Sequence, residues 1–389
     1  MKRYVILRVK KEGARNLHYL DIRSFEDLNG LPTISMEFIP EHAIDELHAD
    51  PEVQAIALVM PTCLVHPLEA AAPLRGNSWG IDAVRADISR YTGAGVKIAI
   101  LDTGIDRTHP AFAGMDLLEM DFSGAGNGDR HGHGTHCAGT VFGRDVGQRI
   151  GVARGVNEAR IGKIFGDDGK GQSDMMFHGL KWAVEQRVDV IALSLGFDFP
   201  GMVAQMMGEG WPADLSTSIA LEAYGANLRM LDAMMALMKL QADSGISPIV
   251  VAAAGNESRR QINAQYRIAT TLPAAAVDVI SVAAVQRAGE KFAMASFSNT
   301  LATVVAPGVD VTSAWPGGGL HTLSGTSTAC AHAAGVVALW HEHLQRSGIH
   351  PNTGNITPRI LYSAQNDIFV PDTKLVDIGK GLISAPWSG

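Results

Sequence analysis

The sequence has few cysteines, few aromatic residues and no long apolar run. Three of its 389 residues are cysteines and 6% are aromatic. A small, odd number of cysteines supplies no disulfide framework and is typical of a reducing compartment. No apolar run approaches the roughly 18 residues that cross a membrane, so we expect no membrane association. The short first apolar run is interrupted by Arg8, so we predict no signal peptide and a cytoplasmic location, with secretion by another route as the alternative.

Positive charge is also in deficit. The chain has 32 Lys and Arg against 40 Asp and Glu, a net charge of −8. This balance gives no electrostatic reason to expect a nucleic-acid partner. Glycine is abundant, with 42 residues, and 46% of the chain is hydrophobic, which is typical of a compact globular protein with many turns. The length predicts one large domain and a small one.

Residues 1–68 are interpreted as a small α+β domain. A core of this size is marginal, so we expect the unit to pack on the rest of the chain. Residues 69–78 are rich in Ala, Pro and Gly and indicate a linker before the large domain, 79–389. The periodicity of the first domain predicts strands at 4–10, 33–38 and 53–60 and a helix at 41–48.

In residues 79–389, apolar runs alternate with helical segments such as 173–186. Several runs are apolar on both faces, as buried parallel strands are. The predicted fold is therefore α/β, with a mostly parallel sheet flanked by helices. Ligand sites in such folds lie at the carboxyl ends of the strands. The predicted strands are 96–101, 188–193, 248–253, 279–283 and 303–306.

Two polar segments follow predicted strand ends. Asp102 ends the strand at 96–101, and residues 129–140 form a stretch rich in glycine and histidine. Taken alone, Asp102 is a turn residue. His131, His133 and His136 raise the alternative of a metal site, but their spacings of two and three across glycine differ from the i, i+4 spacing of helical ligand pairs. We assign no metal to them.

A third segment, 323–330, is a turn of small residues that leads into an apolar helix expected at 331–344. Ser327 would lie near the start of this helix, where free N–H groups and the positive end of the helix dipole face an incoming negative charge. A hydroxyl in that place acts as a nucleophile when a base removes its proton. Alone, such a turn is more often only a helix cap.

Asp102, His133 and Ser327 come in the order acid, base, nucleophile, which is the order found in subtilisin. With their flanking residues they resemble the subtilisin-like serine protease family over about residues 79–389. The matching motifs are Asp102-Thr103-Gly104-Ile105-Asp106, His133-Gly134-Thr135-His136-Cys137-Ala138-Gly139-Thr140, Ser324-Gly325-Thr326-Ser327, Ser194-Leu195-Gly196, Ala252-Ala253-Ala254-Gly255-Asn256, Ala306-Pro307-Gly308 and Gly381-Leu382-Ile383.

The resemblance implies a serine endopeptidase that cuts peptides or proteins without a cofactor. Ser327 would attack the peptide carbonyl, His133 would carry the proton, and Asp102 would orient His133. Asn256 would donate to the oxyanion. The family also holds substrate as an added strand. The expected pocket walls, Ser194 to Gly196 and Ala253 to Gly255, are small and uncharged, so we expect an apolar residue just before the cut. The implied substrate-binding residues are Lys170, Gly171, Gln172, Ser194, Leu195, Gly196, Ala254 and Gly255.

Some positions depart from the family pattern. Phe197 stands where a second glycine is usual, which would narrow an outer substrate pocket. Ala111 stands where many members have a calcium-binding Asp, so a structural calcium ion is left unassigned. The segment 197–247 is longer than usual and rich in methionine. Methionines at helical spacing predict a helix core, with a lid or an oligomer contact as the alternative.

The N-terminal unit resembles the inhibitory propeptide of the family. Residues 1–68 are therefore expected to inhibit the enzyme, with Leu68 in the apolar pocket and a cut between about Leu64 and Asn77. Two other functions stay open at this point. One is a peptide ligase or macrocyclase that uses the same triad. The other is a protease-like binding protein whose site is permanently masked.

Overall fold

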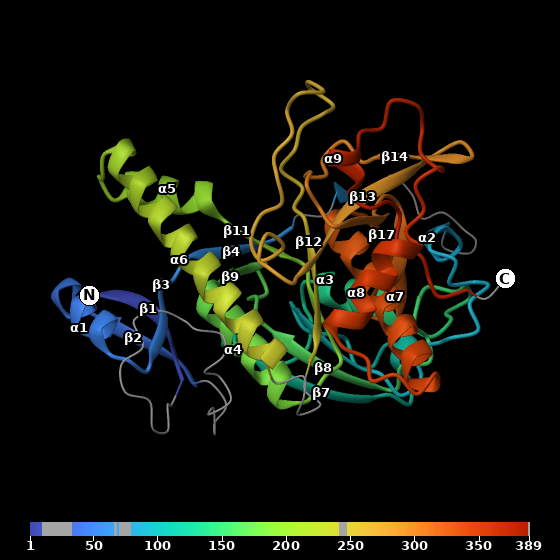
Figure 1. Ribbon diagram of the computed structural model, residues 1–389, viewed down its shortest axis with the longest axis horizontal. Coiled ribbons are helices and arrows are strands. Elements are labelled where there is room, and N and C mark those ends of the chain that lie inside the picture. The colour runs from blue at the N-terminus through green and yellow to red at the C-terminus, as the bar shows by residue number, and fades with distance from the viewer. Residues whose placement is uncertain (10–32, 66–67, 70–78, 241–246, 388–389) are drawn as a thin grey trace.

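The computed structural model describes residues 1–9, 33–65, 68–69, 79–240 and 247–387. Most of the predicted linker, 69–78, and the last residue of the strand predicted at 4–10 lie outside these ranges. The predicted boundaries of the two domains stay a prediction. Within the described residues, an eight-stranded sheet forms the centre of the larger part of the chain (Figure 1).

The central sheet has the strand order β14-β13-β12-β10-β6-β8-β7, and β15 pairs with β13. All of its pairs are parallel except β13 with β14. The predicted α/β fold with a mostly parallel sheet is therefore confirmed. The strands are β6 (Lys97–Asp102), β7 (Asp116–Asp121), β8 (Glu158–Lys163), β10 (Val190–Leu193), β12 (Ile249–Ala253), β13 (Ile280–Ala288), β14 (Lys291–Met294) and β15 (Val304–Pro307).

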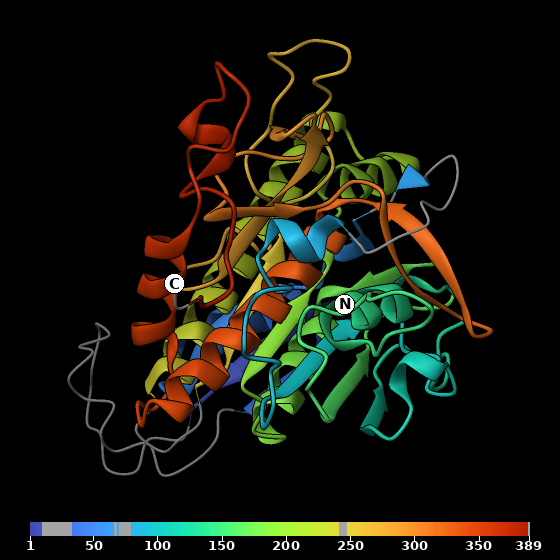
Figure 2. The same cartoon turned by 90° about the vertical axis from the view of Figure 1, so that its right-hand side faces the viewer.

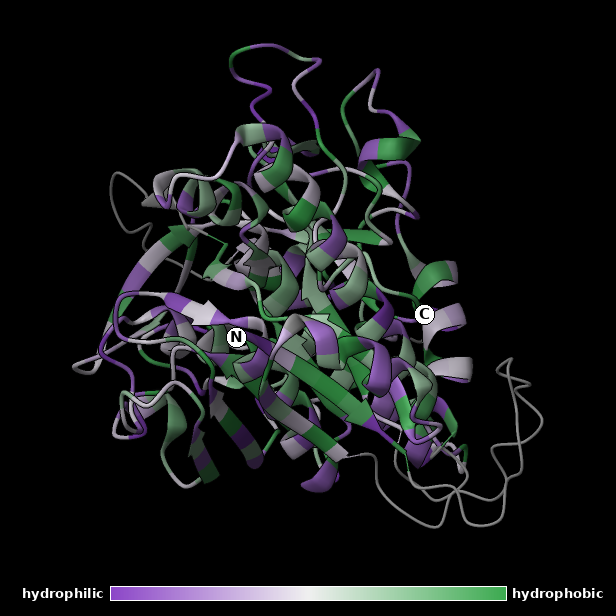
Figure 3. Cartoon of the chain, turned by 90° about the vertical axis from the view of Figure 1, so that its left-hand side faces the viewer, coloured by the Kyte–Doolittle hydropathy of each residue, from purple (hydrophilic) through white to green (hydrophobic). Residues whose placement is uncertain are grey.

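Helices cover both faces of this sheet, because alternate residues of each strand point to opposite sides. Ile98 and Ile100 of β6 pack in one apolar cluster, and Ala99 and Leu101 pack in another. The first cluster includes side chains of α3 (His133–Phe142) and α7 (Thr326–Arg346), and the second those of α4 (Ser173–Glu185) and α6 (Ala213–Leu240). Figure 3 shows the central strands as largely hydrophobic.

The smaller elements complete the fold. No helix in the described part of the chain is long and apolar enough to span a membrane. The other helices within the described ranges are η2 (Glu41–Ala43), α1 (Ile44–Ala49), α2 (Trp79–Ala83), η3 (Pro110–Phe112), α5 (Phe199–Gly208), α8 (Thr353–Ser363) and α9 (Leu375–Ile378).

The N-terminal strands form a separate antiparallel sheet, β2-β1-β3. Its strands are β1 (Lys2–Arg8), β2 (Thr33–Ile39) and β3 (Val53–Leu58). Val5 and Leu7 of β1 are fully buried and belong to the same apolar cluster as Met230 and Leu231 of α6. One face of the small sheet is therefore buried against helices of the larger part of the chain.

Two short strands then carry the N-terminal chain across the carboxyl-end side of the central sheet. β4 (Pro61–Leu64) lies between β11 (Leu195–Phe197) and β9 (Lys170–Gln172) and is antiparallel to both. β5 (Leu68–Glu69) pairs with β17 (Gly319–Ser324), which also pairs with β16 (Val311–Trp315). Figure 2 shows β5 as a short blue arrow beside this orange hairpin.

The methionine-rich segment forms α5 and α6, a helical hairpin that projects from the body of the molecule (Figure 1). The predicted helix core is present, because Met230, Met234, Met235 and Met238 of α6 are buried. Met207, near the tip of the hairpin, is exposed.

Candidate active site

Asp102 and His133 meet where β6 ends and α3 begins. His133 Nδ1 lies 2.8 Å from Asp102 Oδ1, and both side chains are buried. Glycines allow this approach. A Cβ on Gly134 would lie 2.2 Å from the carbonyl oxygen of Gly104, and Gly104 itself has φ of +108°. The first turn of α3 can therefore lie directly on the loop that follows β6.

Asp129 holds these two segments together. Its Oδ1 accepts from Thr103 Oγ1 (2.9 Å) and from the N–H of Gly132 (2.8 Å), and its Oδ2 accepts from the N–H and hydroxyl of Thr135. Thr103 follows Asp102, and Thr135 is two residues after His133. The sequence analysis gave Asp129 no role of its own. Its position four residues before His133, in a glycine-rich loop, was the available signal.

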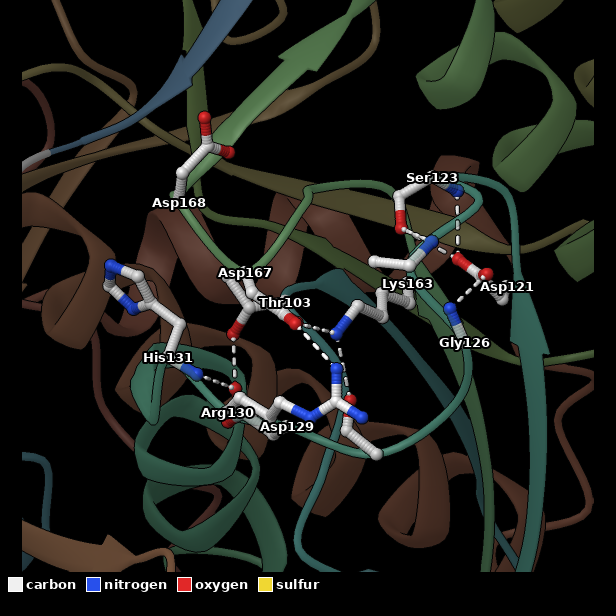
Figure 4. Close-up of polar contacts among 12 residues, drawn as sticks. Thr103, Asp121, Ser123, Gly126, Asp129, Arg130, His131, Lys163, Asp167 and Asp168 are labelled. Atoms are coloured by element: carbon white, nitrogen blue, oxygen red, sulfur yellow. Dashed lines mark hydrogen bonds and ion pairs between the residues drawn. The ribbon is translucent and has the colours of Figure 1, made fainter.

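A second set of contacts, drawn in Figure 4, anchors the loop that leads to α3. Lys163, buried at the end of β8, donates from Nζ to the carbonyl of Gly128 (3.0 Å) and to Asp167 (2.7 Å). Asp167 also accepts from Arg130 at 2.8 Å. Because Gly128 and Arg130 flank Asp129, these contacts fix the loop on both sides of it.

The charge of Asp102 sets the titration of His133. Burial lowers the pKa of His133, but the carboxylate of Asp102 and its hydrogen bond outweigh burial, so the pKa stands well above its usual value. His136, one turn further along α3, has no such partner. Burial lowers the pKa of His136 to about 3, and its Nε2 lies 3.0 Å from the carbonyl oxygen of Val311. His136 is therefore a neutral structural residue.

Ser327 is the second residue of α7 and is fully buried. Among the described residues, its hydroxyl has no hydrogen-bond partner. Two side chains connect it to the histidine. Ser194 Oγ donates to the carbonyl oxygen of Ser327 (3.4 Å), and Cys137 Sγ lies 3.8 Å from both Ser194 Oγ and His133 Nδ1. Ser327 thus lies in the same buried group as Asp102 and His133.

Asn256 follows β12 and contacts the start of α7. Its Oδ1 accepts from the N–H (2.9 Å) and the hydroxyl (3.0 Å) of Thr326. These contacts bring the side chain of Asn256 to the residue that precedes Ser327. Oxyanion stabilisation requires an N–H donor close to the nucleophile.

The predicted substrate-binding segments include β9 and most of β11, and β4 lies between these two strands. Thr62 pairs with Phe197 on one side and with Gly171 on the other, and Cys63 pairs likewise with Gly196 and Lys170. A Cβ on Gly171 would lie 2.8 Å from Thr62 Oγ1, so glycine is needed for this approach. The remaining pairs of the site are Leu195 with Leu64 and Gln172 with Pro61.

The register corrects the expected position of Leu68. The strand held between the two edges ends at Leu64, so the residue that follows it is Val65, which is buried. Leu68 lies instead on β5, where its backbone pairs with Ser324. The sequence alone gave no register, because both residues are apolar and only pairing with distant strands distinguishes them.

Ala254 and Gly255 lie where β12 ends. Ala254 is buried, and Gly255 has φ of +108° and packs closely against Asn299 and Glu257. The carboxylate of Glu257, which accepts from Asn299 Nδ2 at 2.6 Å, was missed by the sequence reasoning. It places a charge beside walls that were expected to be uncharged.

Phe197 packs against α6 of the methionine-rich hairpin. The ring of Phe197 is buried and packs edge-on against Tyr224 of α6, with centroids 6.4 Å apart.

Within the described residues, a single group of His, Cys, Asp or Glu side chains has metal-ligand spacing, and it consists of Asp102, His133 and Cys137. That group contains His133 but neither His131 nor His136.

Comparisons with known proteins agree with this geometry. The family model described as the subtilase family matches residues 93–369. The M-protease of Shouchella clausii (strain KSM-K16) is 30% identical over 82% of this chain and 72% of its own. The subtilisin-like serine protease Pen ch 13.0101 of Penicillium rubens is 30% identical over 88% of this chain and 76% of its own. The chain therefore belongs to the subtilase family of serine proteases.

Proposed function

We propose that this chain is a serine endopeptidase made as an inhibited precursor, with Ser327 as its nucleophile. The observation that carries the proposal is the position of β4. The chain's own residues 61–64 fill the place between β9 and β11 that an extended substrate would take. A protease that holds its own chain in this place is inhibited until that strand leaves.

The chemistry follows from the contacts of each residue. Ser327 Oγ attacks a peptide carbonyl while His133 accepts its proton. Asp102 holds the ring in the required tautomer and stabilises the imidazolium. Asn256 and the backbone N–H of Ser327 stabilise the oxyanion. His133 then gives its proton to the leaving amine, and water releases the acyl group from Ser327 by the same steps.

Subtilases need no cofactor for this reaction. Ala111 is fully buried in the apolar core and offers no side-chain oxygen, so we assign no calcium site at that position. For location we propose a reducing compartment, because Cys63, Cys137 and Cys330 are all free thiols.

A second buried serine, Ser173, starts α4 and is the rival candidate for the nucleophile. Its hydroxyl accepts from the N–H of Met60 at 3.0 Å, so it already has a structural partner. Ser327 has none among the described residues and lies in the group that contains His133. These contacts favour Ser327.

The test is covalent labelling with a fluorophosphonate probe, followed by mapping of the modified residue. We expect the label on Ser327, and we expect wild type, but not Ser327→Ala, to be cut between about residues 64 and 77. A label on Ser173 would overturn the assignment. Joined rather than hydrolysed peptide products, seen by mass, would support the ligase alternative, and absence of labelling even after removal of residues 1–68 would support a masked binding protein.

A further inference from the structure

Residues 58–61, which lead into β4, are held by a series of hydrogen bonds to their main-chain groups. Met60 donates its N–H to Ser173 Oγ (3.0 Å) and accepts from the Ser173 N–H (2.9 Å). The carbonyl of Pro61 accepts from the N–H of Asp198 at 2.9 Å. The carbonyl of Leu58 accepts from Asn227 Nδ2 at 2.8 Å.

These contacts continue the cleft beyond β9 and β11. Ser173 directly follows β9, and Asp198 directly follows β11. Asn227 comes from α6 of the methionine-rich hairpin, which lies alongside β3 (Figure 1). Residues 58–61 are thus bound through groups that every polypeptide has, so the site would accept other extended segments.

Asn227 is a buried polar side chain that contacts the N-terminal chain. It is fully buried, and its Oδ1 has no hydrogen-bond partner among the described residues. Its Nδ2 donates to the carbonyls of Leu58 and Ala223, each at 2.8 Å, so one of its two N–H groups would lose its partner when the N-terminal strands leave. A buried N–H group is costly to leave unpaired. The same face of α6 carries Ala223, Met230 and Met234, all buried. Methionines adapt their shape to different partners.

We propose that Ser173, Asp198 and Asn227 form an extended substrate-binding site, which holds an extended stretch of a protein substrate upstream of the cleft. The inference rests on the proposed function, because the N-terminal strands must leave before substrate enters. It predicts that the enzyme prefers long, extended substrates over short peptides. It also gives the hairpin a role in binding substrate.

The test compares two internally quenched peptides with the sequence of this chain, one of residues 61–78 and one of residues 53–78. The enzyme is the full chain after it has processed itself. We expect kcat/KM to be about tenfold higher for the longer peptide, and Asn227→Ala to reduce that ratio about fivefold, as the loss of one hydrogen bond would. Glu222→Ala, on the exposed side of α6, serves as the matched control and should keep the wild-type ratio.

Equal cleavage of both peptides by wild type overturns the proposal, even if Asn227→Ala fails to fold. An unchanged ratio in a folded Asn227→Ala also overturns it. If wild type cleaves neither peptide, the proposed function fails, and binding of the two labelled peptides, measured by fluorescence anisotropy, then decides. Tighter binding of the longer peptide, weakened by Asn227→Ala, supports the site, and equal binding excludes it.

Discussion

The starts of α7 and α4 resemble each other in sequence position and burial, but their hydrogen-bond contacts differ. Each helix starts within two residues of the end of a strand, and each buries a serine completely in its first turn, Ser327 in α7 and Ser173 in α4. Ser173 Oγ accepts from Met60, whereas Ser327 Oγ has no partner among the described residues. Leaving a buried hydroxyl unpaired costs about 1–3 kcal/mol. This difference favours Ser327, the serine without a hydrogen-bond partner among the described residues, as the reactive group.

Their neighbours differ in the same way. Ser327 lies beside Thr326, which donates to Asn256, and is connected through Ser194 and Cys137 to His133. Ser173 is followed by Asp174, whose Oδ2 lies 2.6 Å from Arg3 of β1. The start of α7 therefore assembles groups for chemistry, and the start of α4 holds the N-terminal strands.

Replacing each of the two serines by alanine should give the largest difference between the starts of α7 and α4. We expect Ser327→Ala to lower kcat by about 10⁶, the size of the loss found when subtilisin loses its nucleophile. Ser173→Ala should leave kcat for a short peptide within about tenfold of wild type, because only a hydrogen bond to the N-terminal chain is lost. Steady-state kinetics on matched, folded samples decide. The reverse pattern would make Ser173 the nucleophile.

The second test concerns the oxyanion. Asn256→Ala should lower kcat by about 10²–10³ with little change in KM, because the amide binds a charge that exists only in the transition state. Asn256→Asp serves as a control of similar size that removes the donor. A loss confined to KM would show that Asn256 binds the ground state instead.

The third test uses the raised pKa of His133. The ring must be neutral to accept the serine proton, so activity is present above its pKa and is lost as the pH falls through it. Because that pKa stands well above 6.5, the acid limb of kcat/KM should also lie above pH 6.5. Asp102→Asn should move the limb of the residual activity downward, because the stabilising charge is gone. A wild-type limb at or below pH 6.5 would contradict the assignment.

The smallest expected effect concerns the contacts by which the start of α4 holds the N-terminal strands in place. In the inactive Ser327→Ala background, Ser173→Ala should speed proteolysis of the exposed N-terminal chain about fivefold, since it removes a hydrogen bond to Met60. Asp174→Asn should do the same through Arg3. Cleavage by an added protease, followed by mass spectrometry, measures the rate. Unchanged rates in both variants would show that these contacts do not hold the strands.

Much of this architecture was predictable from local patterns. The doubly apolar runs gave β6, β10, β12, β13 and β15, because buried parallel strands need no polar face. The strand β8 was missed, since it contains Arg160 and Lys163. Both are buried, and both are paired with carboxylates, Lys163 with Asp167 and Arg160 with Asp116. The two basic residues interrupt the apolar pattern that marked the other buried strands, and neither carboxylate lies within β8 itself.

In the candidate site, too, some features follow from local sequence motifs and others from pairing between distant parts of the chain. Motifs with fixed spacing located Asp102, His133, Ser327 and Asn256, because each motif carries its own turn or helix start. The route of the N-terminal chain through β4 and β5 depends on pairing with strands more than 100 residues away along the chain, such as Leu64 with Leu195. Whether Val65 or Leu68 follows the bound strand was therefore decided by the structure.

The middle position of β4 has a consequence for the behaviour of the enzyme in solution. When that strand leaves, β9 and β11 each lose a hydrogen-bonded neighbour, and β17 loses β5. Unpaired strand edges are templates for association with other chains. The mature enzyme would thus be most prone to aggregation when it is free of substrate. A peptide inhibitor that fills the cleft should act as a stabiliser during purification and storage.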